Sequence, residues 1–319
     1  DFEKHLNQYN VIHLNMQSFL SKTQTIEQMI ALVTKAVGRD LLRAYPDVDY
    51  LDKTILTFML DDIYQDCQVP FIFIIDEWDC IFRSRKNQLE EQTKYLDFLR
   101  DLLKDKSYIA LAYMTGILPI KKYGEHSAIN VFYEYSMTDA SPIEEFTGFT
   151  EQEVRQLCEQ YNMPFSETKK WYDGYCVDGV SIYNPKSVVE AMLRGKFSNY
   201  WTQTETYEAL KIYIQSNEFG VQDVILKLLA GEKEKIDTTT FSNDMVTFAT
   251  KDDVLTLLVH LGYLTYNADT KEIWIPNDEV MEQFISTVKV MGWGSVVTAL
   301  ETSEKLLQAT LSGDEETVA

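Results

Sequence analysis

The chain has 319 residues, of which 45% are apolar and 25% charged, so a small disulfide-stapled scaffold and a wholly disordered chain are both excluded. Its 29 Lys and Arg residues against 50 Asp and Glu residues give a net charge of −21, which disfavours broad binding to nucleic acid. Four cysteines lie apart in the sequence without a C-x-x-C pair, so neither a disulfide framework nor a zinc site is indicated. A reducing, cytoplasmic location is expected.

The sequence shows neither a membrane helix nor an N-terminal signal peptide. No apolar run approaches the roughly eighteen residues that a membrane helix needs, and the first residues lack the apolar core of a signal peptide, so a soluble protein without a membrane partner is expected. The sequence begins without a methionine and runs almost directly into the apolar segment Val11–Asn15. That beginning indicates an excised fragment.

Residues 1–145 alternate short apolar runs with segments of helical period, which is typical of a parallel sheet with helices on its faces. Val11–Asn15, Phe71–Ile75 and Tyr108–Met114 are predicted to be neighbouring parallel strands, the last two apolar on both faces as interior strands are. A crossover helix between them is indicated by an apolar stripe: Tyr95, Leu96, Leu99, Leu102 and Leu103.

A covering helix is expected to begin at Ser21, with Ser21 as its N-cap and Gln24 three residues later. Its apolar stripe consists of Ile26, Met29, Ile30, Val33 and Val37.

The pattern becomes helical from residue 146, where Thr150 and Glu153 form a capping box. We expect a helical lid over residues 146–245 and a winged-helix-like domain over residues 246–297, where a helix is followed by a hairpin. The hairpin turn carries Asp269 and a single Lys271, and this acidic turn argues against a DNA reader. Residues 298–319 read as a linker helix leading toward a missing domain.

The sharpest chemical signal is Asp76-Glu77 directly after the apolar run Phe71–Ile75, because ligands of open α/β sheets bind at the carboxyl ends of the strands. In P-loop nucleotide hydrolases the first acid of such a pair (Walker B) supports Mg²⁺, and the second can accept a proton from the attacking water. Asp76 and Glu77 match these roles. The alternative is an acidic pair that merely ends a strand. Asp79 adds a third carboxylate, either supporting the site or capping a helix.

Thr115 follows the next strand, so its hydroxyl is expected at the same sheet edge as Asp76, where it could sense a phosphate or orient water; an ordinary Thr-Gly turn is the alternative. The nearby cations are better explained as solvated surface residues: Arg83, Arg85, Lys121 and Lys122. The aromatic cluster Trp171–Tyr175 is interpreted as a packed hinge between the sheet domain and the helical domain.

No G-x-x-x-x-G-K-[ST] loop, the usual cradle for nucleotide phosphates, is present in this sequence. Three function classes therefore stay open. The first is an ATPase of the AAA or STAND type whose phosphate loop precedes Asp1, and the second is a nucleotide-free regulatory or scaffold module that binds a protein. The third is a metal-dependent phosphoester hydrolase that uses Asp76, Glu77 and Asp79 as a metal cluster.

The order of several motifs resembles the bacterial AAA-ATPase-like family: Phe71–Asp79, Tyr113–Gly124, Trp171–Tyr175, Ile182–Pro185, Tyr200–Trp201, Asp252–Tyr263 and Ile275–Asn277. The resemblance implies a P-loop ATPase core, a helical lid and a winged-helix-like unit, followed by a PD-(D/E)xK nuclease-like domain. It implies that ATP and Mg²⁺ are the cofactors, that Asp76 supports the metal, that Glu77 is the catalytic acid and that Thr115 is the sensor. The nuclease-like domain, a protein partner or a second copy are the expected partners.

The first testable prediction concerns the 319-residue chain. Because the sequence supplies three carboxylates but no glycine-rich phosphate loop, we expect it to bind Mg-ATP no more tightly than about millimolar, near −4 kcal/mol, and to hydrolyse none. Titration calorimetry measures this affinity. A micromolar dissociation constant would reveal a phosphate site that the sequence pattern does not show.

Overall fold

The computed structural model describes residues 2–85, 87–117, 132–177, 179–201, 218–241 and 248–290, together with some residues between 299 and 314. The chain divides into two compact units: the first contains the residues up to Glu134, and the second contains the described residues from Tyr135 onward. Within these ranges no helix combines the length and the apolar character needed to cross a bilayer. Lys121, Lys122 and most of the predicted linker helix 298–319 lie outside the described residues.

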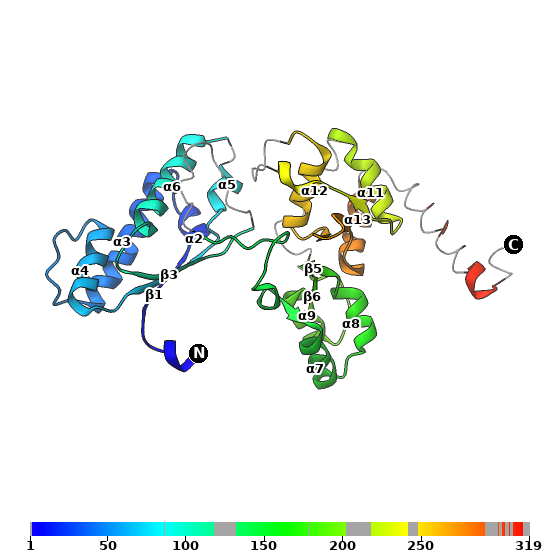
Figure 1. Cartoon of the computed structure of the whole chain (residues 1–319), viewed down its shortest axis with the longest axis horizontal. Helices are drawn as coiled ribbons and strands as arrows, with labels where there is room; N and C mark the ends of the chain where they lie inside the picture. Colours follow the sequence, from blue (N-terminus) through cyan, green and yellow to red (C-terminus); the bar gives the residue numbers. More distant parts are fainter. Residues whose placement is uncertain are drawn as a thin grey trace. The chain divides into compact units, whose positions relative to one another are not determined.

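The first unit is a parallel sheet with its connecting helices (Figure 1). Its elements in chain order are α1 (Phe2–His5), β1 (Asn10–Asn15), α2 (Met16–Leu20), α3 (Ile26–Ala44), α4 (Leu56–Cys67), β2 (Phe71–Asp76), α5 (Cys80–Ser84), α6 (Leu89–Leu103) and β3 (Ile109–Met114). The strands lie in the order β1-β2-β3, and both pairings are parallel. The prediction of three neighbouring parallel strands is confirmed.

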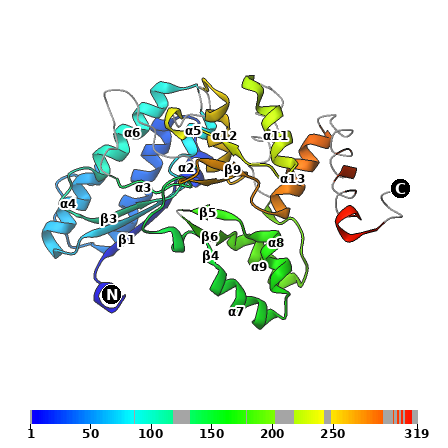
Figure 2. The same ribbon diagram turned by 45° about the vertical axis from the view of Figure 1, so that its right-hand side comes forward.

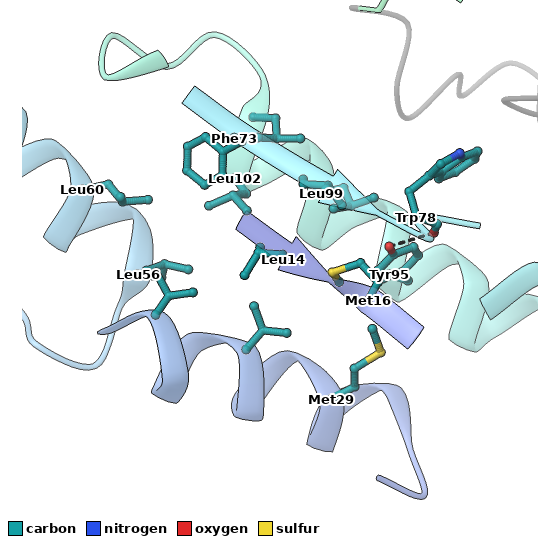
Figure 3. Packing of buried hydrophobic residues seen from close by; sticks show 14 of the residues in the cluster. Leu14, Met16, Met29, Leu56, Leu60, Phe73, Trp78, Tyr95, Leu99 and Leu102 are labelled. Carbon is teal, nitrogen blue, oxygen red and sulfur yellow. Dashed lines mark hydrogen bonds between the residues drawn. The ribbon is translucent and has the colours of Figure 1, made fainter. Parts of the chain in front are cut away.

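One face of this sheet carries the core of the unit. Alternate residues of β2, namely Phe71, Phe73 and Ile75, are buried and belong to one apolar cluster with residues of α3, α4 and α6 (Figure 3). Figures 1 and 2 show these three helices on the same side of the sheet. Both crossovers step in the same direction across the sheet, and right-handed crossovers then place their helices on the same face.

The opposite face of the sheet differs from the expectation of helices on both faces. The side chains of Val11, Leu111 and Tyr113 are 60%, 54% and 52% exposed, and the register aligns Val11 with Ile72 and Leu111. The prediction of a fully covered interior strand at Tyr108–Met114 is therefore wrong for the part of the chain that the structure describes. The prediction failed because an apolar run in the sequence shows that its side chains are hydrophobic but does not show which element of the fold covers them.

The covering helix α3 begins later than predicted. Thr25 is its N-cap and accepts a hydrogen bond from the backbone N–H of Gln28, whereas Ser21 ends the preceding short helix α2. Ser21 and Thr25 are both good capping residues, and the sequence pattern alone favoured the first. The predicted apolar stripe lies against the core, with Ile26, Met29, Val33 and Val37 buried and Ile30 packed beside them.

The second unit combines helices with two small antiparallel sheets, of order β4-β6-β5 and β7-β9-β8. Figure 2 shows α7, α8 and α9 beside the first of these sheets. The elements are η1 (Glu144–Phe146), β4 (Phe149–Thr150), α7 (Glu151–Tyr161), α8 (Phe165–Tyr172), β5 (Tyr175–Val177), β6 (Val180–Tyr183), α9 (Pro185–Arg194), η3 (Glu218–Gly220), α11 (Val221–Leu229), β7 (Glu234–Lys235), η4 (Thr238–Thr240), α12 (Lys251–His260), β8 (Thr265–Asn267), β9 (Glu272–Trp274) and α13 (Asp278–Val290).

Two sequence patterns of this unit reappear in its structure. The capping box of Thr150 and Glu153 begins α7, and α12 is followed by the β8–β9 hairpin at the position where the sequence indicates a helix and a hairpin. The assignments of a lid and of a winged-helix-like domain stay predictions.

The segment Trp171–Tyr175 packs inside the second unit, which corrects its interpretation as a hinge to the sheet domain. Gly174 has a φ of +102°, and a Cβ atom there would lie 1.9 Å from the carbonyl oxygen of Pro276. Asn277 donates its side-chain N–H to the carbonyl of Asp173 at 2.8 Å, and the Tyr175 hydroxyl donates to the carbonyl of Gly262 at 3.0 Å.

A buried carboxylate, Glu279 at the start of α13, joins this helix to α9 and to the segment that contains Tyr200 and Trp201. Its Oε1 atom accepts hydrogen bonds from the Ser187 hydroxyl at 2.9 Å, from the Tyr200 backbone N–H at 2.7 Å and from the Trp201 backbone N–H at 3.0 Å. Burial raises the pKa of this carboxyl, and the three donors oppose that rise by stabilising the charged form.

The structure of the first unit predicts that Leu99→Ala lowers the stability of the sheet by about 3 kcal/mol, because Leu99 is buried in the core and its truncation leaves a cavity. Leu111→Ala on the exposed face of β3 is the matched control and should cost about 0.5 kcal/mol. Hydrogen exchange of the β2 amides reports the opening free energy of this unit alone. Equal losses in the two variants would contradict the one-sided core.

Candidate functional site

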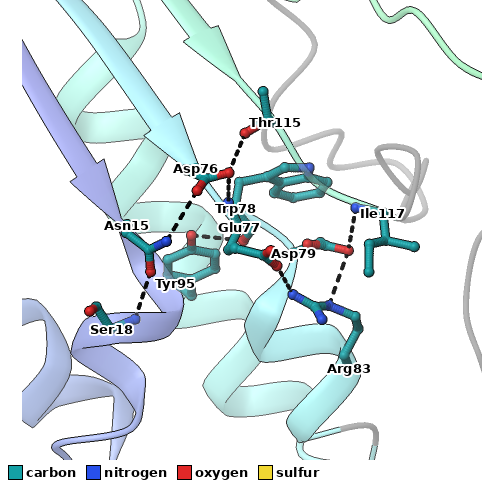
Figure 4. Close-up of polar contacts among 10 residues, drawn as sticks. All are labelled: Asn15, Ser18, Asp76, Glu77, Trp78, Asp79, Arg83, Tyr95, Thr115 and Ile117. Atoms are coloured by element: carbon teal, nitrogen blue, oxygen red, sulfur yellow. Dashed lines mark hydrogen bonds and ion pairs between the residues drawn. The ribbon is translucent and has the colours of Figure 1, made fainter. Parts of the chain in front are cut away.

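The carboxyl ends of the three parallel strands bring together Asn15, Asp76 and Thr115 (Figure 4). The Thr115 hydroxyl donates to Asp76 Oδ1 at 2.6 Å, and the Asn15 side-chain N–H donates to Asp76 Oδ2 at 3.1 Å. The structure therefore places Thr115 against Asp76, at the edge where the sequence predicts both. Asn15 was missed, although it ends its own apolar strand and the same strand-end rule would have found it.

Glu77 follows Asp76 in an unusual backbone conformation. Its φ of +56° lies in the left-handed region, which is unfavourable for a residue with a side chain and is found preferentially at functional sites. The Glu77 backbone N–H donates to Asp76 Oδ1 at 3.0 Å, and the next N–H, of Trp78, donates to the carbonyl of Thr115 at 3.1 Å. Contacts on both sides thus hold the turn that presents Glu77.

Asp79 is fully buried and fastens the chain beyond β3 to the turn after β2. Its Oδ2 atom accepts a hydrogen bond from the Ile117 backbone N–H at 3.1 Å. The approach between these segments depends on Gly116, because a Cβ atom there would lie 2.7 Å from Trp78 Cδ1 and 2.8 Å from Asp79 Oδ1. Asp79 occupies the N-cap position of α5 but makes no side-chain capping bond, so it supports the site rather than capping the helix.

Arg83 lies beside these acids, which corrects its interpretation as a solvated surface residue. Its guanidinium donates to Glu77 Oε2, and its Nε atom lies 3.4 Å from Asp79 Oδ2. The Arg83 side chain is 19% exposed. Arg85 is also half-buried, but it donates to the side chain of Gln88 and to the carbonyl of Gln24 rather than to a carboxylate.

Trp78 and Cys80, which follow Glu77 in the chain, belong to the buried apolar cluster of the first unit. Tyr95 of α6 is buried and donates its hydroxyl to the carbonyl of Trp78 at 2.8 Å, which ties the crossover helix to the turn that carries Glu77 (Figure 3). Burial raises the pKa of the neighbouring Cys80 thiol to about 12, so this thiol stays protonated near neutral pH and is not an activated nucleophile. The carboxylates and the Thr115 hydroxyl are the groups available for chemistry.

Asp76 fits a role as a support for a hydrated divalent cation. A carboxylate offers about four acceptor positions, and Asp76 uses three of them: two on Oδ1 and one on Oδ2. Mg²⁺ usually keeps several of its waters, so one remaining position is sufficient to hold a metal-bound water.

Asp76, Glu77 and Asp79 do not form the three-carboxylate metal cluster considered for a phosphoester hydrolase. No group of three or more His, Cys, Asp or Glu residues suited to a metal ion occurs in the described part of the chain. Glu77 and Asp79 face Arg83 instead, whereas Asp76 faces Asn15 and Thr115. The cluster hypothesis is wrong for this geometry.

Comparisons with known proteins support the resemblance in the part of the chain that holds the site. The profile of the AAA-ATPase-like family, described as predicted AAA-ATPase, matches residues 1–124 and confirms the resemblance over that segment. A curated relative, "Uncharacterized protein in vnfD 5'region" of Azotobacter chroococcum mcd 1, is 26% identical over 141 residues. That match covers 42% of this chain and spans 27% of the relative's length.

Among solved structures, the Walker-type ATPase paby2304 of Pyrococcus abyssi is similar at 13% identity and a TM-score of 0.47, covering 88% of this chain and 85% of that chain.

The geometry predicts that Thr115→Val lowers the free energy of unfolding of the first unit by about 1 kcal/mol, because a charge-assisted hydrogen bond at a half-buried position is lost. Thr115→Ser keeps the hydroxyl and should retain most of that free energy. Hydrogen exchange of the β2 amides measures both variants. A loss in Thr115→Ser as large as in Thr115→Val would show that the hydroxyl bond contributes nothing.

Proposed function

We propose that the first unit is the catalytic core of an ATPase that, in the intact protein, hydrolyses ATP to ADP and phosphate. The observation that carries this proposal is the contact between Thr115 and Asp76 at the carboxyl edge of a parallel sheet, with Glu77 beside them in a left-handed turn. The match of residues 1–124 to a predicted AAA-ATPase family supports the same reaction.

Asp76 would hold Mg²⁺ through a metal-bound water. The ion would supply charge neutralisation between the β- and γ-phosphates of ATP. The part played by the chain is to fix the carboxylate: Asn15 donates to one oxygen and Thr115 to the other, so Asp76 stays in one orientation. Thr115 would also act as the sensor of the γ-phosphate.

Glu77 would accept the proton of the attacking water. As water oxygen bonds to the γ-phosphorus, the bond from that phosphorus to the bridging oxygen breaks, and ADP leaves with the bond electrons. The proton passes to the Glu77 carboxylate, which must face the water when this occurs. Two hydrogen bonds hold the turn around Glu77: the Ile117 N–H donates to the Asp79 carboxylate, and the Trp78 N–H donates to the carbonyl of Thr115.

The rest of the chain completes the proposal. The helical and hairpin parts of the second unit would serve as the lid and the winged-helix-like unit, which respond to ATP. The four cysteines are free thiols, in keeping with a cytoplasmic location. A nuclease-like domain, another protein or a second copy is the proposed partner.

Glu77→Gln in the full-length native protein tests the reaction. The amide keeps the shape of the side chain but cannot accept the proton, so we expect ATP binding within about twofold of wild type and turnover lowered about 10²- to 10⁴-fold. Phosphate release and equilibrium nucleotide binding are measured on the same preparations. Unchanged phosphate release would take Glu77 out of the mechanism, and a full-length protein that binds no nucleotide would favour the regulatory or scaffold module.

Asp76→Ala tests the metal-supporting role. We expect Mg²⁺-dependent ATP binding to weaken while metal-free binding changes little, because the lost carboxylate acts on the nucleotide only through the ion. Glu90→Gln on α6 is the matched control, since Glu90 is exposed and pairs only with Lys94 among the described residues. Equal Mg²⁺ dependence in Asp76→Ala and wild type would contradict the assignment.

A further inference from the structure

We propose that Arg83 is a positioning residue that holds Glu77 in a resting orientation and must release it before Glu77 can accept a proton. This inference rests on the proposed ATPase function and adds a residue and a restraint to it. It is carried by three side chains: the guanidinium of Arg83 and the carboxylates of Glu77 and Asp79.

The two carboxylates that contact Arg83 differ in their freedom to move. Asp79 has no exposed side-chain surface and is bonded to the Ile117 backbone, so it is a fixed anchor. The Glu77 side chain is 34% exposed. Glu77 can therefore leave the guanidinium while Arg83 stays paired with Asp79, and no buried charge loses its counter-ion when the contact opens.

The orientation of Glu77 shows what the contact does. Figure 4 shows its carboxylate directed toward Arg83 on α5, whereas Asp76 and Thr115 contact each other on the other side of the turn. A carboxylate oxygen that accepts a guanidinium hydrogen bond is occupied at that position and stabilised in its charged form. The ion pair thus turns the proposed base away from Thr115 and has to be broken before reaction.

The geometry also explains why an arginine is suited to this role. Its planar guanidinium carries several N–H groups in fixed directions, so one side chain can contact two carboxylates at once. Lysine carries a point charge and would pair with Asp79 or Glu77 without fixing the direction of either. Arg83→Lys therefore retains the charge but loosens the restraint.

The first experiment measures steady-state ATP hydrolysis by the full-length native protein. In Arg83→Met, which keeps the aliphatic stem, we expect kcat to rise about tenfold at unchanged KM. The reason is that the variant removes a charge-assisted hydrogen bond that must break before the reaction in the wild type. Arg83→Lys should give an intermediate rise. Arg85→Met is the matched control, because Arg85 contacts no carboxylate among the described residues, and its kcat should equal that of wild type.

The second experiment uses the 319-residue chain and needs no nucleotide. Thermal unfolding of the first unit is followed in Arg83→Met, in Glu77→Gln and in the double variant. If the two side chains are coupled, the melting temperature of the double variant falls by less than the sum of the single losses, by about 2 °C or more. The same cycle with Arg85→Met in place of Arg83→Met should be additive.

The outcomes separate the restraint from the function. A lower kcat in Arg83→Met at unchanged stability, or a higher KM, overturns the restraint, because Arg83 would then assist the reaction or bind phosphate. An additive thermal cycle overturns it as well, because the side chains of Arg83 and Glu77 would then not be coupled. Absence of hydrolysis in wild type and in every Arg83 variant, with a coupled thermal cycle, overturns the ATPase function and the restraint with it. A rise of kcat with a coupled cycle supports both.

Discussion

Parallel strands can be joined only by connections long enough to carry the chain back to the starting end of the sheet. In the first unit α3 and α4 make the first return and α6 makes the second. All three strands consequently finish at one edge, and the residues that follow them become neighbours whatever their separation in sequence. Asn15 and Thr115 stand 61 and 39 residues from Asp76 and still bond its carboxylate. The polar site is thus a direct result of strand direction.

The same convergence creates an electrostatic problem, because Asp76, Glu77 and Asp79 lie within one turn of a chain that already carries a net charge of −21. Burial of Asp79 would be costly without partners. Backbone and side-chain N–H groups meet part of this demand, and Arg83 supplies positive charge to two of the acids at once. The site combines one well-fixed carboxylate, Asp76, with a second, Glu77, whose partner is a charge rather than the backbone.

Much of the first unit could be predicted from its sequence because the signals are local. An apolar run followed by Asp76 or Thr115 specifies both a strand and the edge at which the polar residue emerges. The contacts of Arg83 could not be predicted in this way, because an arginine six residues after Glu77 on a short helix is as compatible with solvent as with an ion pair. The exposed face of β3 depends on which elements cover it, and neither Leu111 nor Tyr113 carries that information. For the start of α3, Ser21 and Thr25 are both favourable capping residues, and the sequence does not show which of them the helix uses.

Gly174 in the second unit has a consequence for how this protein can change. Its backbone lies so close to Pro276 that any side chain at position 174 would meet the carbonyl oxygen of Pro276. Three residues after Pro276, Glu279 accepts hydrogen bonds from Ser187, Tyr200 and Trp201. A piece of the chain that stopped before Pro276 would leave the backbone of Gly174 without this contact and the three donors without their acceptor. The helical and hairpin segments therefore have to be inherited, exchanged or engineered as one block.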